Sequence, residues 1–155
     1  MINQRRLLLK RTAAGSAIAL LASAGLLTPT RVLASLSRDA FALRNADEAI
    51  RNATGGDPQD SDAINIKAPD IAENGAVVPV TVSSTLEGAD AIWLFAANNP
   101  LPLTSAYEIP EGTEPYVSTR IKMGETGDVI AVVRAGDALY AARKEVKVTI
   151  GGCGG

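Results

Sequence analysis

The 155-residue sequence contains no histidine and one cysteine, and these shortages exclude most enzyme chemistry. Without histidine, a His-activated nucleophile, a His general base and most zinc sites are ruled out. One cysteine provides too few thiolates for a zinc or iron–sulfur site within a monomer. No glycine-rich phosphate loop opens a helix, and no two carboxylates are marked as a catalytic pair. We therefore expect a non-catalytic protein with no cofactor and no metal.

Long hydrophobic runs are also lacking. The longest, over residues 12–27, is too short for a comfortable membrane span, although an N-terminal membrane anchor is the alternative. It follows a basic segment with the pair Arg5-Arg6 and precedes Val32-Leu33-Ala34, which suits cleavage after Ala34. Residues 4–10 resemble a twin-arginine export signal. We expect residues 1–34 to be a signal peptide that directs the folded protein to the periplasm.

Basic residues become scarce once this signal is removed. The first 34 residues contain five of the 15 basic residues and none of the 17 acidic ones, so the remaining 121 carry a formal charge of −7. An excess of acid argues against nucleic acid or an anionic membrane as a partner. A chain of this length is enough for one domain with a single core.

The feature around which the chain is organised is its last five residues, Gly151-Gly152-Cys153-Gly154-Gly155. We call this segment the arm. Because glycine adopts both signs of φ freely, we expect the arm to be flexible and without regular secondary structure. Fully extended, it reaches on the order of 15 Å. The arm therefore places a thiol on a thin tether that can enter a narrow channel in another protein. The alternative is an unstructured end that contains a cysteine by chance.

Nothing near Cys153 activates its thiol. No lysine or arginine lies within five residues, and the carboxylate expected at Gly155 opposes formation of the thiolate. Activation would then come from a partner's active site, which favours a passive carrier over a self-sufficient thiol catalyst.

One helix is predicted in the mature chain, over residues 36–52. Its apolar residues recur at helical spacing, Ser37 is a plausible N-cap, and Gly55-Gly56 end it. The acidic loop 57–62 that follows lacks the spacing and the closing glutamate of a calcium-binding loop.

From Ile64 onwards the hydrophobic period becomes two. We expect strands at residues 64–67, 77–82, 91–95, 116–123, 129–133 and 139–150, separated by Gly, Pro and Asn turns. The continuous apolar run 91–95 predicts a central buried strand, and Pro79 predicts an edge or a bulge. Short strands at this spacing predict a mainly β fold, an immunoglobulin-like antiparallel β-sandwich with one N-terminal helix. The expected organisation is residues 1–34 as signal, 35–150 as the sandwich domain and 151–155 as the flexible arm.

The sequence resembles the SoxY family of sulfur carriers in bacterial thiosulfate oxidation. The terminal Gly-Gly-Cys-Gly-Gly carries the resemblance, together with the twin-arginine signal. Two segments of the body support it: residues 68–80, which begin Ala-Pro-Asp-Ile-Ala-Glu-Asn-Gly, and residues 93–100, Trp-Leu-Phe-Ala-Ala-Asn-Asn-Pro. The resemblance covers essentially the whole mature chain.

The resemblance implies covalent carriage of sulfur on Cys153. It implies a heterodimer with a SoxZ-like β-sandwich subunit. It also implies transient partners: a c-type cytochrome complex that loads thiosulfate, a manganese-dependent hydrolase that releases sulfate and, in some organisms, a sulfur dehydrogenase.

Two other readings of the lone cysteine stay open. Cys153 could cross-link two copies of an exported structural protein through an intermolecular disulfide. A thiol oxidoreductase would need a second cysteine or a nearby cation, and the sequence has neither.

Overall fold

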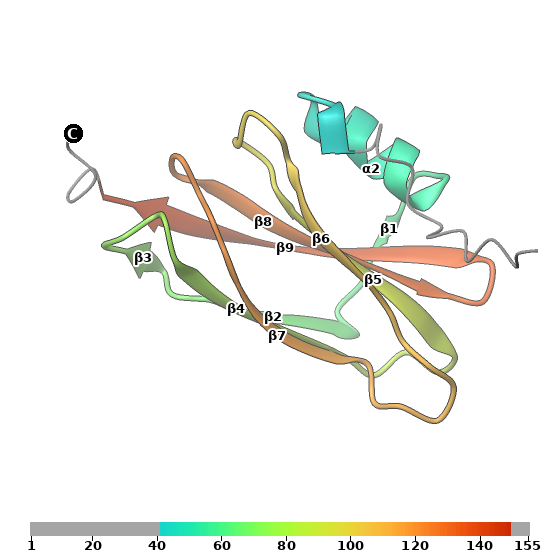
Figure 1. Cartoon of the computed structure of the whole chain (residues 1–155). Helices are drawn as coiled ribbons and strands as arrows, with labels where there is room; N and C mark the ends of the chain where they lie inside the picture. Colours follow the sequence, from blue (N-terminus) through green and yellow to red (C-terminus); the bar gives the residue numbers. More distant parts are fainter. Residues whose placement is uncertain (1–40, 150–155) are drawn as a thin grey trace, which may run out of the picture. The chain divides into compact units, whose positions relative to one another are not determined.

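Two β-sheets packed face to face form the body of the protein, with one helix on the outer face of the larger sheet (Figure 1). The computed structural model describes residues 41–149. The elements are α2 (Ala46–Thr54), β1 (Gln59–Asp60), β2 (Ile64–Lys67), β3 (Ile71–Ala72), β4 (Val78–Ser84), β5 (Ala89–Ala96), β6 (Leu103–Glu108), β7 (Tyr116–Ile121), β8 (Gly127–Ala135) and β9 (Ala138–Val148).

The larger sheet has the order β1-β9-β8-β5-β6, and the smaller has the order β2-β4-β7. All neighbours are antiparallel except β1 and β3, which both run parallel to β9. The strand β1 pairs near the start of β9 and β3 pairs at its end, so two short strands lie along one edge of β9. This arrangement confirms the predicted β-sandwich. Within the described residues, no helix is long and apolar enough to cross a membrane.

The pattern of apolar residues in each strand depends on whether one face of the strand or both faces are buried. In β4, Val78, Val80 and Val82 point into the core between the sheets, and the residues between them are more exposed. The strand β5 is buried on both faces, because Ile92 and Leu94 face the other sheet while Trp93 and Phe95 pack in a second core with α2. The predicted central buried strand at 91–95 is thus confirmed. Burial on two faces explains why its sequence is continuously apolar.

The helix begins later than the sequence pattern predicts. Residues 43–45 are not helical, and α2 begins at Ala46 with Asn45 as its N-cap, whereas Ser37 lies outside the described residues. The Asn45 side chain accepts hydrogen bonds from the backbone of Asp47 and Glu48, at 2.9 and 3.1 Å. An asparagine cap followed by acids is the favoured start of a helix, so this local signal sets the boundary. The predicted end is confirmed: Gly55 caps the helix with φ of 86°.

Pro79 lies in the middle strand of the smaller sheet, so the prediction of an edge strand is wrong for β4 as a whole. The proline is accommodated because β2 pairs with β4 only as far as Thr81. At Pro79, the pairing that the described strands provide is with Arg120 of β7. A missing N–H is tolerated where a strand has a neighbour on one side only.

Candidate functional site

The predicted carrier residue, Cys153, lies outside the described residues, as do the arm glycines Gly151, Gly152, Gly154 and Gly155 and the export pair Arg5 and Arg6. The structure does describe the base of the arm. Strand β9 ends at Val148, and Thr149 is the last described residue. The sequence-predicted inward position Val146 is fully buried, and Glu145 and Lys147 are exposed.

The last residues of β9 are held on both sides. On one side β8 pairs with β9 as far as Val146, and on the other β3 pairs with Lys147 and Val148. The backbone N–H of Val148 donates to the Thr126 hydroxyl at 2.9 Å, and the N–H of Thr149 donates to the Ala72 carbonyl at 3.1 Å. The chain therefore leaves the sandwich from a fixed point.

Three loops gather around this point, one after each of β3, β5 and β7 (Figure 1). We call this region the exit end: the last residues of β9 with loops 73–77, 97–102 and 122–126. The Met123 N–H donates to the Gly75 carbonyl at 2.7 Å, which joins the first loop to the third. The Asn99 amide joins the second to the third, donating to the Lys122 carbonyl at 2.7 Å and accepting from the Gly124 N–H at 2.9 Å.

Two glycines are required for this close packing. A Cβ on Gly75 would clash with the Met123 carbonyl oxygen and lie 2.8 Å from Cγ1 of Val148. A Cβ on Gly127 would lie 2.8 Å from the Asn98 amide nitrogen, which donates to the Thr126 carbonyl at 2.8 Å. At Gly75 any larger residue would require a shift of backbone, and at Gly127 it would displace the Asn98 side chain from its present position.

These contacts explain what residues 68–80 and 93–100, the two segments whose sequences resemble the SoxY family, do in the fold. The first reaches the exit end at Asn74 and Gly75, and the second at Asn98 and Asn99. In the sequence they are separate turns, but in the fold they are parts of one structure that holds the base of the arm.

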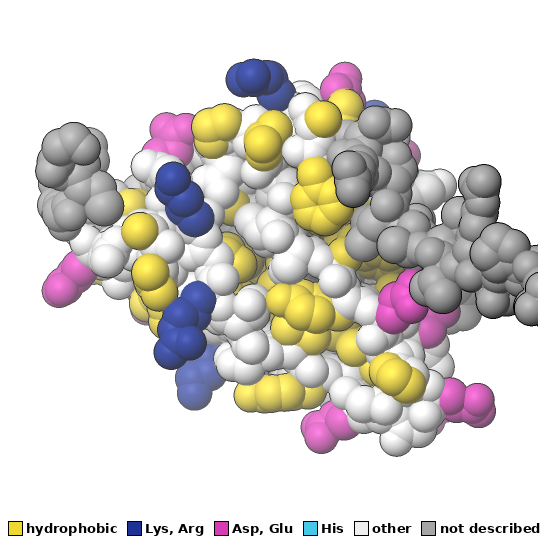
Figure 2. Space-filling model, in the orientation of Figure 1, with side chains coloured by type: hydrophobic (Ala, Val, Ile, Leu, Met, Phe, Trp, Pro, Cys, Tyr) yellow, Lys and Arg dark blue, Asp and Glu magenta, His cyan; other side chains and the backbone are white. Residues whose placement is uncertain are grey.

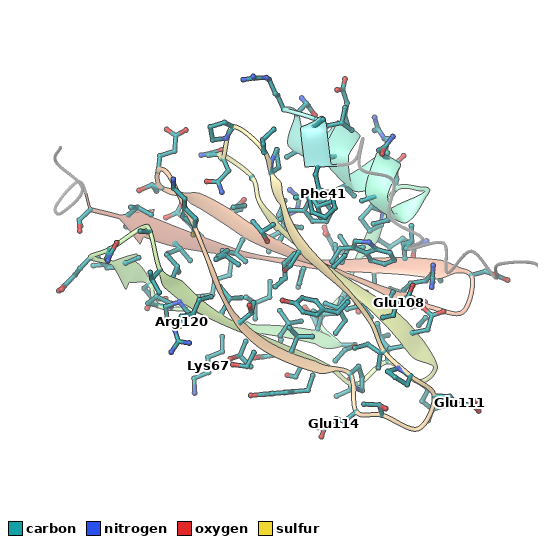
Figure 3. The ribbon with its side chains drawn as sticks, in the orientation of Figure 1. Phe41, Lys67, Glu108, Glu111, Glu114 and Arg120 are labelled. Atoms are coloured by element: carbon teal, nitrogen blue, oxygen red, sulfur yellow. The ribbon has the colours of Figure 1, made fainter. Side chains whose placement is uncertain are left out.

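Charge is distributed unevenly over the small sheet. Figure 3 shows Lys67 and Arg120 on one part of it and Glu111 and Glu114 toward its other end. At the exit end, Lys144 pairs with Asp70 at 3.0 Å.

A hollow of about 90 Å³ lies beside α2, lined by the helix residue Ala53 and by residues of β5, β6 and β8. Within it, the guanidinium of Arg134 lies 5.6 Å from the centre of the Trp93 ring, and its Nε donates to Asp90 at 2.7 Å. The Asp90 hydrogen bond raises the pKa of Arg134, and this cation is thus already paired. The lining includes no serine, threonine or cysteine, and the hollow lies toward the end of β8 remote from the exit end.

Metal ligands do not gather in the body. Among residues 41–149, no three His, Cys, Asp or Glu side chains lie together as a metal site would require. The acids of the 57–62 loop are included in that statement, and Asp57 is paired with Arg51 at 2.6 Å.

Fold and sequence together define a class of protein: a rigid β-sandwich that clamps its last strand and continues into a glycine segment with one cysteine. The chain belongs to the SoxY family, because the family model described as "Sulfur oxidation protein SoxY" matches residues 50–153. That match covers the exit end and extends to Cys153.

The solved structure of one SoxY protein agrees with this membership. The sulfur carrier protein SoxY from Chlorobium limicola f thiosulfatophilum is 47% identical with a TM-score of 0.62, over 67% of this chain and 96% of that chain. The reeler domain of human F-spondin is matched at 14% identity with a TM-score of 0.40, over 59% of this chain and 91% of that one. No curated protein sequence matches the chain.

Proposed function

We propose that this protein is the sulfur carrier of a bacterial thiosulfate-oxidising system and holds its cargo covalently on Cys153. One observation carries the proposal: the family match runs through residue 153, the single cysteine of the chain. The 47% identical relative is itself a sulfur carrier protein.

The geometry at the arm base supports carriage. Cys153 is four residues beyond Thr149, so an extended arm brings its sulfur within roughly 14 Å of the last anchored residue. The anchor is fixed because β8 pairs with β9 as far as Val146, β3 pairs with Lys147 and Val148, and the Val148 N–H also donates to the Thr126 hydroxyl. A fixed base and a tether of glycines allow one thiol to visit several active sites without movement of the sandwich.

The loading step is an oxidation. The Cys153 thiol loses its proton, a bond forms between its sulfur and the sulfane sulfur of thiosulfate, and two electrons leave. A c-type cytochrome complex both catalyses the step and accepts these electrons. Since no basic residue stands near Cys153 in the sequence, the partner has to favour the thiolate.

The remaining partners follow from the same family role. A manganese-dependent hydrolase removes sulfate from the loaded arm, and a sulfur dehydrogenase acts where the host has one. A SoxZ-like β-sandwich subunit forms a heterodimer with the domain of residues 35–150. We place the complex in the periplasm, exported folded through the twin-arginine pathway that Arg5 and Arg6 would engage.

The test is Cys153→Ser in a reconstituted system of carrier, partner subunit and enzymes. The variant should support no thiosulfate-dependent electron transfer and should keep the melting temperature of the wild type, because residue 153 follows the last strand. Wild-type turnover by the serine variant would refute the carrier role. A wild-type protein that is found only as a disulfide-linked dimer would favour the structural alternative.

A further inference from the structure

Exposed apolar side chains occur on the segments that adjoin the base of the arm. Five large hydrophobic side chains are exposed among residues 41–149. Two of them, Val77 and Leu101, belong to the exit end, with 50% and 48% of their surface accessible, and a third, Ile71 at 58%, is on β3, which pairs with the end of β9. Ile71 pairs with Lys147 near the end of β9, Val77 is the last residue of the first loop, and Leu101 is in the second loop. We call these three residues the collar. Toward this end, at the left of Figure 2, apolar side chains lie between charged ones.

Resting on the proposed function, we infer that the collar is the surface on which each enzyme that acts on the Cys153 sulfur docks. The partner surface has a matching apolar rim around the mouth of its channel. Its contact with the collar precedes and directs entry of the arm.

The short distance in sequence between Thr149 and Cys153 requires that an enzyme acting on the sulfur bind close to the collar. Thr149 is anchored, and the sulfur of Cys153 reaches only about 14 Å beyond it. A reactive group set in a channel must therefore approach the exit end closely, so the rim of the channel meets the loops around β9. The same length limits the channel, whose reactive group lies no more than about 14 Å below its mouth.

The size of the collar favours a transient partner over a permanent one. Three half-exposed apolar side chains offer on the order of 200–300 Å², well below the roughly 800 Å² per partner of a standard stable interface. A permanent subunit seated there would also block the arm. A small apolar surface that forms and releases contacts suits a carrier that serves several enzymes in turn.

The base of the collar is rigid, so its residues can be changed without unfolding the domain. Neighbouring backbone is fixed by the Met123–Gly75 and Asn99–Gly124 hydrogen bonds, to which the three side chains do not contribute. The test is the triple variant Ile71→Thr, Val77→Thr and Leu101→Gln, which removes apolar surface, nearly keeps side-chain size at positions 77 and 101, and shortens the side chain at position 71 by one carbon.

The matched control is Tyr116→Thr. Tyr116 is 53% exposed and begins β7 at the end opposite to the loop that contains Met123, so it equals the collar in exposure but not in position. The rate of thiosulfate-dependent electron transfer by the c-type cytochrome complex is measured against carrier concentration for both proteins. In parallel, alkylation of Cys153 by iodoacetamide reports on the thiol itself.

For the triple variant we expect kcat/KM to fall tenfold or more, mainly through a higher KM, because a uniform docking contact is lost. Its alkylation rate and its melting temperature should match those of the wild type. Tyr116→Thr should stay within twofold on every measure. Equal enzymatic rates for the triple variant and the control would overturn the collar proposal while leaving the carrier role intact.

Loss of the co-purifying subunit from the triple variant would instead place the collar in the permanent interface and contradict the proposal. Cys153→Ser separates the two hypotheses. If that variant still turns over, carriage on Cys153 is wrong and the collar proposal fails with it; if it does not, the collar is judged on the triple variant alone.

Discussion

Gly75 is the residue at which the packing of the exit end can be tested most sharply, by the substitution Gly75→Ala. The added Cβ would overlap the Met123 carbonyl oxygen, which is backbone and cannot rotate away. It would also press on Val148, which pairs with β3 at the start of the arm. Relief requires that the β3–β4 loop move outward, and that movement breaks the 2.7 Å hydrogen bond from Met123.

The cost can be worked from these contacts. Overpacking against fixed backbone costs about 1–3 kcal/mol, and loss of one backbone hydrogen bond costs about 1 kcal/mol. We expect the free energy of unfolding to fall by about 2–4 kcal/mol, which lowers the melting temperature of a domain this size by about 8–16 °C. Thermal unfolding followed by the fluorescence of Trp93 measures this change.

Gly124→Ala provides the control at the same end of the molecule. A Cβ there would lie 3.8 Å from the Asn99 side-chain oxygen, an ordinary van der Waals distance. Its melting temperature should change by less than about 3 °C, as expected for a surface substitution without a clash. If Gly75→Ala melts within 2 °C of the wild type, the loops do not pack as described and the clamp on Val148 is not supported.

Three further predictions concern the arm, the helix and the second loop. Replacing Gly152 and Gly154 by valine should leave the alkylation rate of the thiol unchanged but slow enzyme-dependent sulfate release severely, because a Cβ-bearing arm cannot enter a narrow channel; normal release would show that the glycines are not needed for entry. Asn45→Ala should lower the free energy of unfolding by about 1 kcal/mol through loss of the N-cap, and no change in chemical denaturation would contradict the helix start at Ala46. Asn99→Ala removes two hydrogen bonds between loops and should speed amide hydrogen exchange in residues 122–126, whereas unchanged exchange would argue against that bridge.

The parts of the fold that the sequence predicts are those with a periodic burial pattern. The segment 64–67 alternates because one face of β2 is buried, and β9 alternates toward its end for the same reason. Strand β5 could be predicted from its apolar run, although the cause of that run, a helix on one face and a sheet on the other, is visible only in the structure.

Strands that lack a periodic pattern of apolar residues could not be predicted from the sequence. Strand β6 was not predicted because it is an edge strand with Thr104 to Tyr107 all partly buried, so no period is present. The two-residue strands β1 and β3 exist only through their pairing with β9. The support that β3 gives to the base of the arm therefore depends on tertiary contacts.

Part of the candidate site can likewise be predicted from the sequence, and part of it is visible only in the structure. The arm and Cys153 remain predictions from the sequence, and they are based on an isolated thiol among glycines. The turns at Asn74 to Gly75 and at Asn98 to Asn99 can be predicted as turns from their residue types. That these turns converge on one end of β9 cannot be predicted from the sequence. The carbonyl to which the Asn99 amide donates belongs to Lys122, which lies 23 positions further along the chain.

Covalent carriage on Cys153 is tested most directly by the intact mass of the protein after turnover with thiosulfate, followed by mapping of the modified peptide. If Cys153 carries the cargo, the subunit is not disulfide-linked to a second copy and its mass rises by a sulfur-containing group, with the whole increase on the C-terminal peptide that contains Cys153. Treatment with a thiol reductant should return the mass to that of the unmodified protein. An unmodified C-terminal peptide during active thiosulfate oxidation would contradict the account.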